Sequence, residues 1–258
     1  MKLQTIIVVA AMIASSACTG CSSSPGRPGP DSEVLPPNQV MEFKLLYAQN
    51  CAGCHGADGK GGAAIALANP VFLAIADNAA IRRIVADGVR ATAMPAFAQS
   101  AGGMLTDKQI DALVQGIRSW QKPDTLRDTG PPPYMAQAPG DPERGAEAYQ
   151  TYCSSCHGVD GRGGSKASSI VDGSYLALVS DQYLRTIVIA GRPELGAPDW
   201  RSDVKGRPMS AHEISDVVAW LSSHRIQFPG QPYQSSADRA KGEPRRVKKP
   251  ECRDAQCS

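Results

Sequence analysis

Two short runs of cysteine and histidine carry the most specific chemistry in this sequence. The runs are Cys51-Ala-Gly-Cys54-His55 and Cys153-Ser-Ser-Cys156-His157. Two thiols in one turn can each add to a vinyl group of the same porphyrin, and the histidine directly after them can reach the iron from one face. Each run therefore predicts one covalently attached haem c, with the histidine as an iron ligand.

Other uses of paired cysteines fit these runs less well. A thioredoxin-like dithiol has no fixed histidine and sits in a βαβ context, which the helical pattern described below does not provide. A zinc site needs four clustered ligands, whereas each half of the chain offers two cysteines and one histidine. A structural disulfide needs no histidine at this position. Haem attachment is therefore preferred over zinc, dithiol and disulfide.

The residues around the two runs repeat. Residues 47–62 match residues 149–164 at the cysteines, the histidine, one aspartate and the four glycines after the histidine. Further along, residues 105–110 and Trp120 correspond to residues 209–214 and Trp220. Self-similarity over this length predicts two domains of the same fold.

Helices must position the two runs, because apolar residues recur with helical spacing. We expect a first helix behind Asn38, with Met41, Leu45 and Leu46 on one face. Middle helices are expected over 78–87 behind an aspartate cap and over 182–190 behind another.

The last helix of each half has the clearest start signal. Thr106 begins one and Ser210 the other, the second with a glutamate three residues on that completes a capping box. The expected inner face in the first half is formed by Ile110, Leu113, Val114, Ile117 and Trp120. No strand is predicted, so the fold class is all-α.

The expected domain organisation follows from the repeat and from composition. It comprises a lipoprotein-like signal peptide at 1–20, a linker at 21–37, domain 1 at 38–122, a proline-rich linker at 123–139, domain 2 at 140–228 and a polar basic tail at 229–258. The linker contains Pro131-Pro132-Pro133, which favours a stiff extended chain. We therefore expect domains that are tethered rather than fused.

The N-terminus is typical of an exported protein. Lys2 precedes an apolar run over 6–14, followed by small residues. Gly20-Cys21 before a serine-rich stretch favours a lipid on Cys21, with Cys18 as the rival site and simple cleavage near Ala17 as the alternative. The predicted location is periplasmic and lipid-anchored, with the lipid as the only membrane contact.

Charge and the remaining cysteines add two expectations. The formal net charge of +2 is too small for a nucleic-acid partner. Cys252 and Cys257 are expected to form a small-loop disulfide in an oxidising compartment, with free thiols as the alternative.

With these motifs the chain resembles the class I cytochrome c family, over Gln39–Gln121 and Asp141–Phe228. The resemblance implies tandem cytochrome c-like domains, two covalently bound haem c groups and one-electron transfer between redox protein partners. In that family a methionine before proline binds the second face of the iron, which implies Met94 as a ligand. The family usually has glycine where domain 1 has Phe43, so helix packing is expected to differ there.

Domain 2 departs from the family at the sixth iron ligand. Aligning Gly88 with Gly191 places Ala197 where domain 1 has Met94. Met209 is the nearest replacement, although a hydrophobic staple before the helix cap explains it equally well. His212 and His224 are further candidates, and an iron without a protein sixth ligand is the remaining alternative.

Two classes of function stay open at this point. A haem iron with histidine and methionine ligands favours an electron carrier over an enzyme, and no catalytic residue is assigned. An open haem in domain 2 instead favours an enzyme acting on a small molecule, with Arg192 facing a propionate or a substrate. An electron-donating subunit of a dehydrogenase fits the first class. A haem-based sensor is a third class, but no output segment supports it.

Overall fold

The computed structural model describes residues 35–123, 125–126, 129–202, 204 and 206–226. Within these residues all regular structure is helical, apart from three isolated bridges. The described part therefore confirms the all-α prediction. The expected signal peptide with Cys18 and Cys21, and the tail with Cys252 and Cys257, lie outside the described residues.

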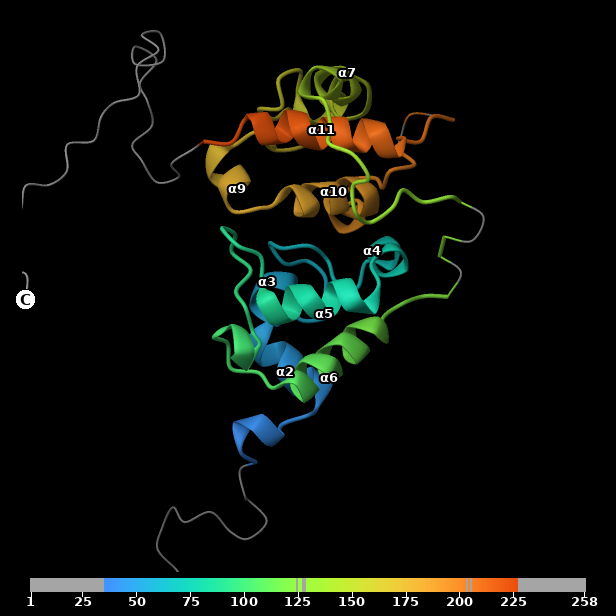
Figure 1. Ribbon diagram of the computed structural model, residues 1–258. Helices are drawn as coiled ribbons and strands as arrows, with labels where there is room; N and C mark the ends of the chain where they lie inside the picture. The colour runs from blue at the N-terminus through green and yellow to red at the C-terminus, as the bar shows by residue number, and fades with distance from the viewer. Residues whose placement is uncertain (1–34, 124, 127–128, 203, 205, 227–258) are drawn as a thin grey trace, which may run out of the picture.

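Each half of the chain folds into a small helical domain (Figure 1). Domain 1 contains η3 (Pro37–Gln39), α2 (Phe43–Asn50), α3 (Ala52–His55), α4 (Pro70–Ile75), α5 (Asn78–Asp87), η4 (Gln99–Ala101) and α6 (Asp107–Arg118). Domain 2 contains α7 (Pro142–Tyr152), α8 (Ser154–His157), α9 (Gly173–Ala177), α10 (Asp181–Ala190), η5 (Pro193–Leu195) and α11 (Ala211–Ser223).

Side-chain caps start the helices close to where the sequence predicts them. Asp77 caps α5 as expected, while Ser180 caps α10, which begins at Asp181, one residue earlier than predicted. Thr106 and Ser210 cap α6 and α11, and both helices have a complete capping box. These caps satisfy N–H groups that a helix leaves unpaired at its start.

The first helix differs from the prediction. Asn38 lies in η3 and caps nothing, and α2 begins only after Glu42. The reason is a long-range contact, because the buried amide of Gln109 in α6 donates to the carbonyls of Pro37 and Val40. This contact holds the segment outside a helix. Of the apolar face that was expected there, only Leu46 is buried.

The core of each domain is a helix crossing, α2 with α6 and α7 with α11. Ile110, Leu113 and Ile117 of α6 are almost completely buried, which confirms the inner face expected there. Ile214 and Val217 are the buried counterparts on α11. The last helix of each domain therefore supplies the surface on which the helix before the CxxCH turn packs, α2 in domain 1 and α7 in domain 2.

The crossing in domain 1 is built around Phe43. Its ring packs directly on Gly116 of α6, where an added Cβ would lie 2.0 Å from the ring. One turn later, Trp120 meets Phe43 and Tyr47 edge-on, with ring centroids 5.2 and 5.1 Å apart. A glycine on α6 thus makes room for the phenylalanine on α2.

Domain 2 exchanges the large and small residues between its two helices. Counted from the helix caps, Trp220 stands where domain 1 has Gly116, and it stacks on Tyr149 at 4.2 Å. The glycine is now Gly145 on α7, where an added Cβ would lie 2.8 Å from the Cβ of Trp220. Trp120 and Trp220 thus differ by one helical turn in their distance from the helix cap, yet each indole packs on the corresponding tyrosine and glycine, so the predicted pairing holds in space.

A buried carboxylate joins α7 to α11 in domain 2. Asp216 accepts hydrogen bonds from Nε of Arg144 at 2.9 Å and from the backbone N–H of Asp141 at 2.7 Å. Burial acts to raise the pKa of Asp216, but these hydrogen bonds outweigh it and hold the pKa below its usual range.

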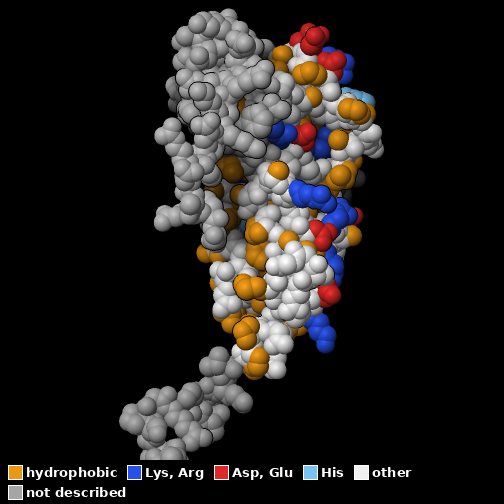
Figure 2. Space-filling model, turned by 60° about the vertical axis from the view of Figure 1, so that its left-hand side comes forward, with side chains coloured by type: hydrophobic (Ala, Val, Ile, Leu, Met, Phe, Trp, Pro, Cys, Tyr) orange, Lys and Arg blue, Asp and Glu red, His pale blue; other side chains and the backbone are white. Residues whose placement is uncertain are grey.

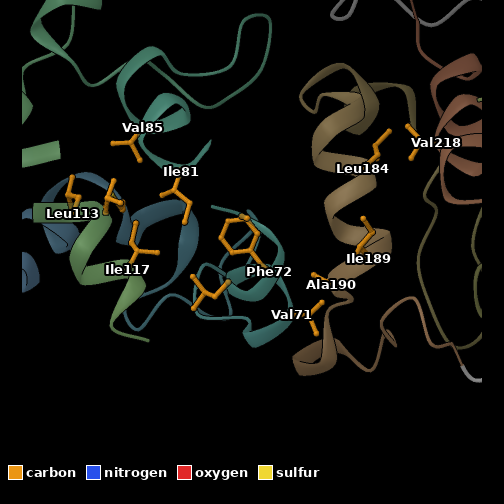
Figure 3. Packing of buried hydrophobic residues seen from close by; sticks show 14 of the residues in the cluster. Val71, Phe72, Ile81, Val85, Leu113, Ile117, Leu184, Ile189, Ala190 and Val218 are labelled. Carbon is orange, nitrogen blue, oxygen red and sulfur yellow. The ribbon is translucent and has the colours of Figure 1, made fainter. Parts of the chain in front are cut away.

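The two domains are in contact, which differs from the expectation of tethered domains. Helix α4 of domain 1 lies against α10 of domain 2, and Figure 3 shows Val71 beside Ala190 across this joint. The amide of Asn69, which is 5% exposed, donates to the carbonyls of Ala190 at 3.0 Å and Gly191 at 3.4 Å. An apolar contact and buried hydrogen bonds therefore both connect the domains.

The proline-rich linker lies on domain 2. Its described residues form no helix or strand, and they include a turn in which the N–H of Thr129 donates to the carbonyl of Leu126 at 3.2 Å. The buried guanidinium of Arg185 in α10 donates to the carbonyls of Pro133 and Tyr134, and also to the hydroxyl of Ser215. Buried backbone carbonyls need such donors, so Arg185 fastens the linker to α10.

The described surface is mixed in character. On the face in Figure 2, acidic and basic side chains are interspersed along one edge and hydrophobic side chains lie among polar ones. None of the helices in the described residues is both long enough and apolar enough to cross a membrane.

Candidate haem sites

Each CxxCH run forms a single helical turn that follows a longer helix. The N–H of His55 donates to the carbonyl of Cys51 at 2.9 Å, and the N–H of His157 donates to that of Cys153 at 3.0 Å. This turn places the two thiols and the imidazole of each run close together, as attachment to one porphyrin requires.

Both histidines are oriented in the same way. Nδ1 of His55 lies 2.8 Å from the carbonyl oxygen of Ile65, and Nδ1 of His157 lies 2.8 Å from that of Ser168. A carbonyl can only accept, so Nδ1 carries the proton and Nε2 keeps its lone pair for a metal. Burial lowers the pKa of His55, which favours the neutral imidazole that metal binding needs.

A tyrosine fixes the end of each turn. The hydroxyl of Tyr47 donates to the carbonyl of Gly56 at 2.9 Å, and Tyr149 makes the same hydrogen bond to Gly158. Gly56 has a φ of 82°, and a Cβ there would lie 1.7 Å from the carbonyl oxygen of Lys60. Only glycine can therefore end the turn in this conformation.

The thiols fit haem attachment better than the other uses of paired cysteines. The four cysteines of the runs are free, and burial with the neighbouring thiol raises the pKa of Cys51 and Cys153 to about 11. A redox dithiol needs a lowered thiol pKa. No group of three His, Cys, Asp or Glu side chains is placed to hold a metal ion within the described residues. A porphyrin, which takes two thiols and one imidazole per run, suits this set.

Met94 lies on the loop that follows α5 and is half-buried. Its carbonyl accepts a hydrogen bond from the N–H of Val89 at 3.0 Å, and the backbone of Gly88 passes directly against Met94 and Pro95. The loop is thus held to the end of α5 by backbone contacts, so its position does not depend on the methionine side chain.

The matching loop of domain 2 has the same backbone contacts and a different side chain. The N–H of Arg192 donates to the carbonyl of Ala197 at 3.0 Å, and Gly191 passes against Ala197 and Pro198. The contacts confirm the sequence alignment of Ala197 with Met94. Alanine therefore occupies the position of the implied sixth ligand.

Met209 occupies the position that Leu105 has in domain 1. Both side chains are 6% exposed. Both backbone N–H groups donate to the loop before them, Leu105 to Phe97 and Met209 to Trp200, each at 2.8 Å. Met209 directly precedes the Ser210 cap, where a hydrophobic staple is expected.

The two candidate histidines of domain 2 have other surroundings. His212 is exposed in the first turn of α11. Nδ1 of His224 lies 2.8 Å from the carbonyl oxygen of Trp220, and its ring packs edge-on against the indole at 4.7 Å. His224 matches Trp120 only in its sequence distance from the helix cap.

Sequence reasoning missed a contact between the two sites. The guanidinium of Arg192, which is 9% exposed, donates to the carbonyl of Gly62 in the glycine-rich loop of domain 1 at 2.8 Å and pairs with Glu194. Arg192 thus touches the loop behind one CxxCH run and carries the backbone that holds Ala197. The sequence gives one sign of this contact, namely that domain 2 has a charged residue at the position where domain 1 has Val89.

Comparison with known proteins agrees with this geometry. The family described as cytochrome c oxidase, cbb3-type, subunit III matches residues 38–115 and 140–221. The cytochrome bc1 complex cytochrome c subunit of Corynebacterium diphtheriae is 24% identical over 75% of this chain and 71% of its own length. The cbb3-type oxidase subunit FixP of Azorhizobium caulinodans is 29% identical over 52% of this chain and 44% of its own.

A third relative extends the pattern. The cbb3-type oxidase subunit CcoP of Azospirillum sp. is 30% identical over 50% of this chain and 42% of its own length. The chain thus spans less than half of the FixP and CcoP proteins. Because the family match covers more than half of the chain, with one region in each domain, the chain belongs to this family of c-type cytochromes, which bind haem c covalently.

Proposed function

We propose that this chain is an exported dihaem c-type cytochrome that passes single electrons between redox protein partners outside the cytoplasmic membrane. The observation that carries the proposal is the duplicated CxxCH geometry. In both domains the histidine donates through Nδ1 to a loop carbonyl and leaves Nε2 free. The names of the relatives, a cytochrome c subunit of a cytochrome bc1 complex and a subunit of a cbb3-type cytochrome c oxidase, support redox protein partners.

Each group of residues has a defined task in this proposal. Cys51 and Cys54 in domain 1, and Cys153 and Cys156 in domain 2, hold haem c through thioether bonds. His55 and His157 bind the two irons, and Met94 is the proposed second ligand in domain 1. Haem c supplies reversible one-electron chemistry at iron, with a potential that methionine raises.

The protein contributes orientation and exclusion of water. The carbonyls of Ile65 and Ser168 fix the two imidazoles, which keeps each histidine in one tautomer and raises its strength as a ligand. The helices that lead into the two CxxCH turns, α2 and α7, pack against α6 and α11 through buried apolar residues. A site fixed in this way changes little on reduction, which suits electron transfer.

Counting haems tests the proposal directly. Intact mass and haem staining after denaturing electrophoresis should give two covalent haems per chain. Changing Cys153 and Cys156 to alanine should remove one of them and leave domain 1 loaded. The matched control changes Ser154 and Ser155 to alanine, which keeps both cysteines and should keep both haems.

A wild-type chain with one haem, or with haem that acid–acetone extracts, would refute the dihaem proposal. Met94→Ala should retain both haems but lower the potential of the domain 1 haem and remove its methionine-to-iron charge-transfer band. An unchanged band would refute Met94 as the ligand. The proposed boundaries, 38–122 and 140–228, are tested by the survival of domain 1 in the double cysteine variant.

Anchoring is a separate part of the proposal. We propose a lipid on Cys21, because a short apolar run and small residues precede it and a serine-rich stretch follows. Intact mass of the membrane fraction decides this point. A mature chain that begins at Cys18 would move the site, and an unmodified soluble chain would remove it.

A further inference from the structure

The sixth-ligand position of domain 2 is the clearest difference between two otherwise matching sites. Backbone contacts place Ala197 where domain 1 has Met94, since Val89 and Arg192 make the same 3.0 Å hydrogen bond to those two residues. Alanine ends at Cβ and carries no atom that binds iron. The loop therefore presents no side-chain ligand at the point where domain 1 presents a thioether sulfur.

The described residues of this loop before Met209, namely 193–202, 204 and 206–208, offer no substitute, because none of them is a methionine, histidine, cysteine or lysine. The loop is also held in place by backbone contacts, because a Cβ added at Gly191 would lie only 2.8 Å from the carbonyl oxygen of Ala197. A shift of the loop that brought another residue to this position would break the hydrogen bonds between Arg192 and Ala197.

Met209 is already used in the core. It is as buried as Leu105, it makes the same backbone hydrogen bond, and it precedes the same kind of capped helix. A leucine performs this task in domain 1, so the task requires an apolar side chain and no sulfur. Binding iron would require Met209 to leave this buried position.

The histidines are also accounted for. His224 is held by the carbonyl and the indole of Trp220. His212 lies exposed on the first turn of α11. Neither belongs to the loop of Ala197.

We infer that domain 2 is a binding site for a small exogenous ligand of ferrous haem, of the size and chemistry of carbon monoxide, with Ala197 leaving that face of the iron open. The inference rests on the proposed dihaem function. It assigns a different task to each domain: domain 1, with Met94, is closed by its own side chain and carries electrons, whereas domain 2 can bind a ligand.

Carbon monoxide titration of the reduced full chain, with both haems attached, tests this assignment. Wild type should bind one carbon monoxide per two haems. Ala197→Met restores the methionine-proline pair of domain 1, so it should reduce the carbon monoxide bound at least tenfold and add a second methionine-to-iron charge-transfer band. Met209→Leu places the residue of domain 1 in the core, and it should bind carbon monoxide as wild type does, within about twofold.

Two results would overturn the inference. The first is a wild type that carries two haems and binds no carbon monoxide; a Met209→Leu variant that then binds one would identify Met209 as the ligand. The second is an Ala197→Met variant that is fully loaded and binds as much as wild type. If Ala197→Met fails to fold, the Met209→Leu comparison still decides. Intact mass of each preparation separates the two proposals, since a single haem refutes the dihaem function, while two haems without carbon monoxide binding refute only the open site.

Discussion

Asn69 offers a way to separate the docking of the two domains from the stability of one helix. Its Oδ1 accepts hydrogen bonds from the N–H groups of Val71 and Phe72 at the start of α4, at 2.8 and 3.1 Å. Its Nδ2 donates across the joint to Ala190 and Gly191. Asn69→Asp keeps the cap of α4, because aspartate caps a helix as well as asparagine does. It removes the hydrogen bonds to domain 2, because an aspartate side chain donates none.

The expected loss of stability at the contact between the domains follows from the carbonyl groups left without hydrogen-bond donors. A buried carbonyl that loses its donor costs about 1–3 kcal/mol, and the new carboxylate faces two carbonyl oxygens. At about 1.4 kcal/mol per tenfold, amide exchange at the end of α10 should become about 5-fold to about 100-fold faster. Exchange in α4 should stay the same, since its cap is intact.

Amide hydrogen exchange followed by mass spectrometry measures both helices in the same sample. Asn69→Ala should accelerate exchange in α4 as well, because it also removes the cap, which contributes about 1 kcal/mol. The matched control is Asp172→Ala, which removes the exposed cap of α9, a hydrogen bond of 2.9 Å accepted from the N–H of Tyr175, and leaves the hydrogen bonds of Asn69 in place.

Equal protection of α10 in Asn69→Asp and wild type would refute this reasoning. It would mean that the hydrogen bonds across the joint do not restrain α10. Acceleration of α4 in Asn69→Asp would refute the separation of the two roles, because the cap would then depend on the joint.

Three further substitutions have defined outcomes. Arg192→Gln in domain 2 should accelerate exchange around Gly62 in domain 1, by about 5-fold or more for a lost donor of about 1–3 kcal/mol; unchanged exchange there would contradict the link. Asp216→Asn should lower the urea-unfolding free energy of domain 2 at pH 7 by about 1 kcal/mol after screening of its exposed arginine partner. The pKa of Asp216 in the folded chain is below the unfolded value of about 3.9, so its contribution to the unfolding free energy is present above that pH and is lost as the pH falls through the folded pKa. The unfolding free energy of the Asn variant should therefore depend less on pH in the acid range. The same pH dependence in both proteins would contradict this. Gly145→Ala places a methyl carbon 2.0 Å from the carbonyl oxygen of Asp216 and should destabilise domain 2 by about 1–3 kcal/mol in the same urea assay. The control is Gly53→Ala, which should not destabilise domain 1 because no atom lies within 4 Å of the added carbon.

The features that the sequence alone determined are those set by neighbouring residues. The CxxCH turns join residues four positions apart, and the helix caps at Asp77, Thr106 and Ser210 accept hydrogen bonds from N–H groups three positions on. The alignment of Ala197 with Met94 also came from the sequence, since glycines mark the end of the preceding helix in both domains. Such contacts depend on short stretches of chain, so residue types and spacing suffice to predict them.

The features that only the tertiary structure decided join residues far apart in the chain. Asn69 meets Ala190 across 121 positions, and Arg192 meets Gly62 across 130, so no local pattern indicated that the domains dock. The exchange of Phe43 and Gly116 for Gly145 and a tryptophan likewise moves an aromatic ring from one helix to the other. A periodic pattern identifies the buried face of one helix, but the volume that must be filled is set by both helices, and packing in three dimensions selects which of them supplies the ring.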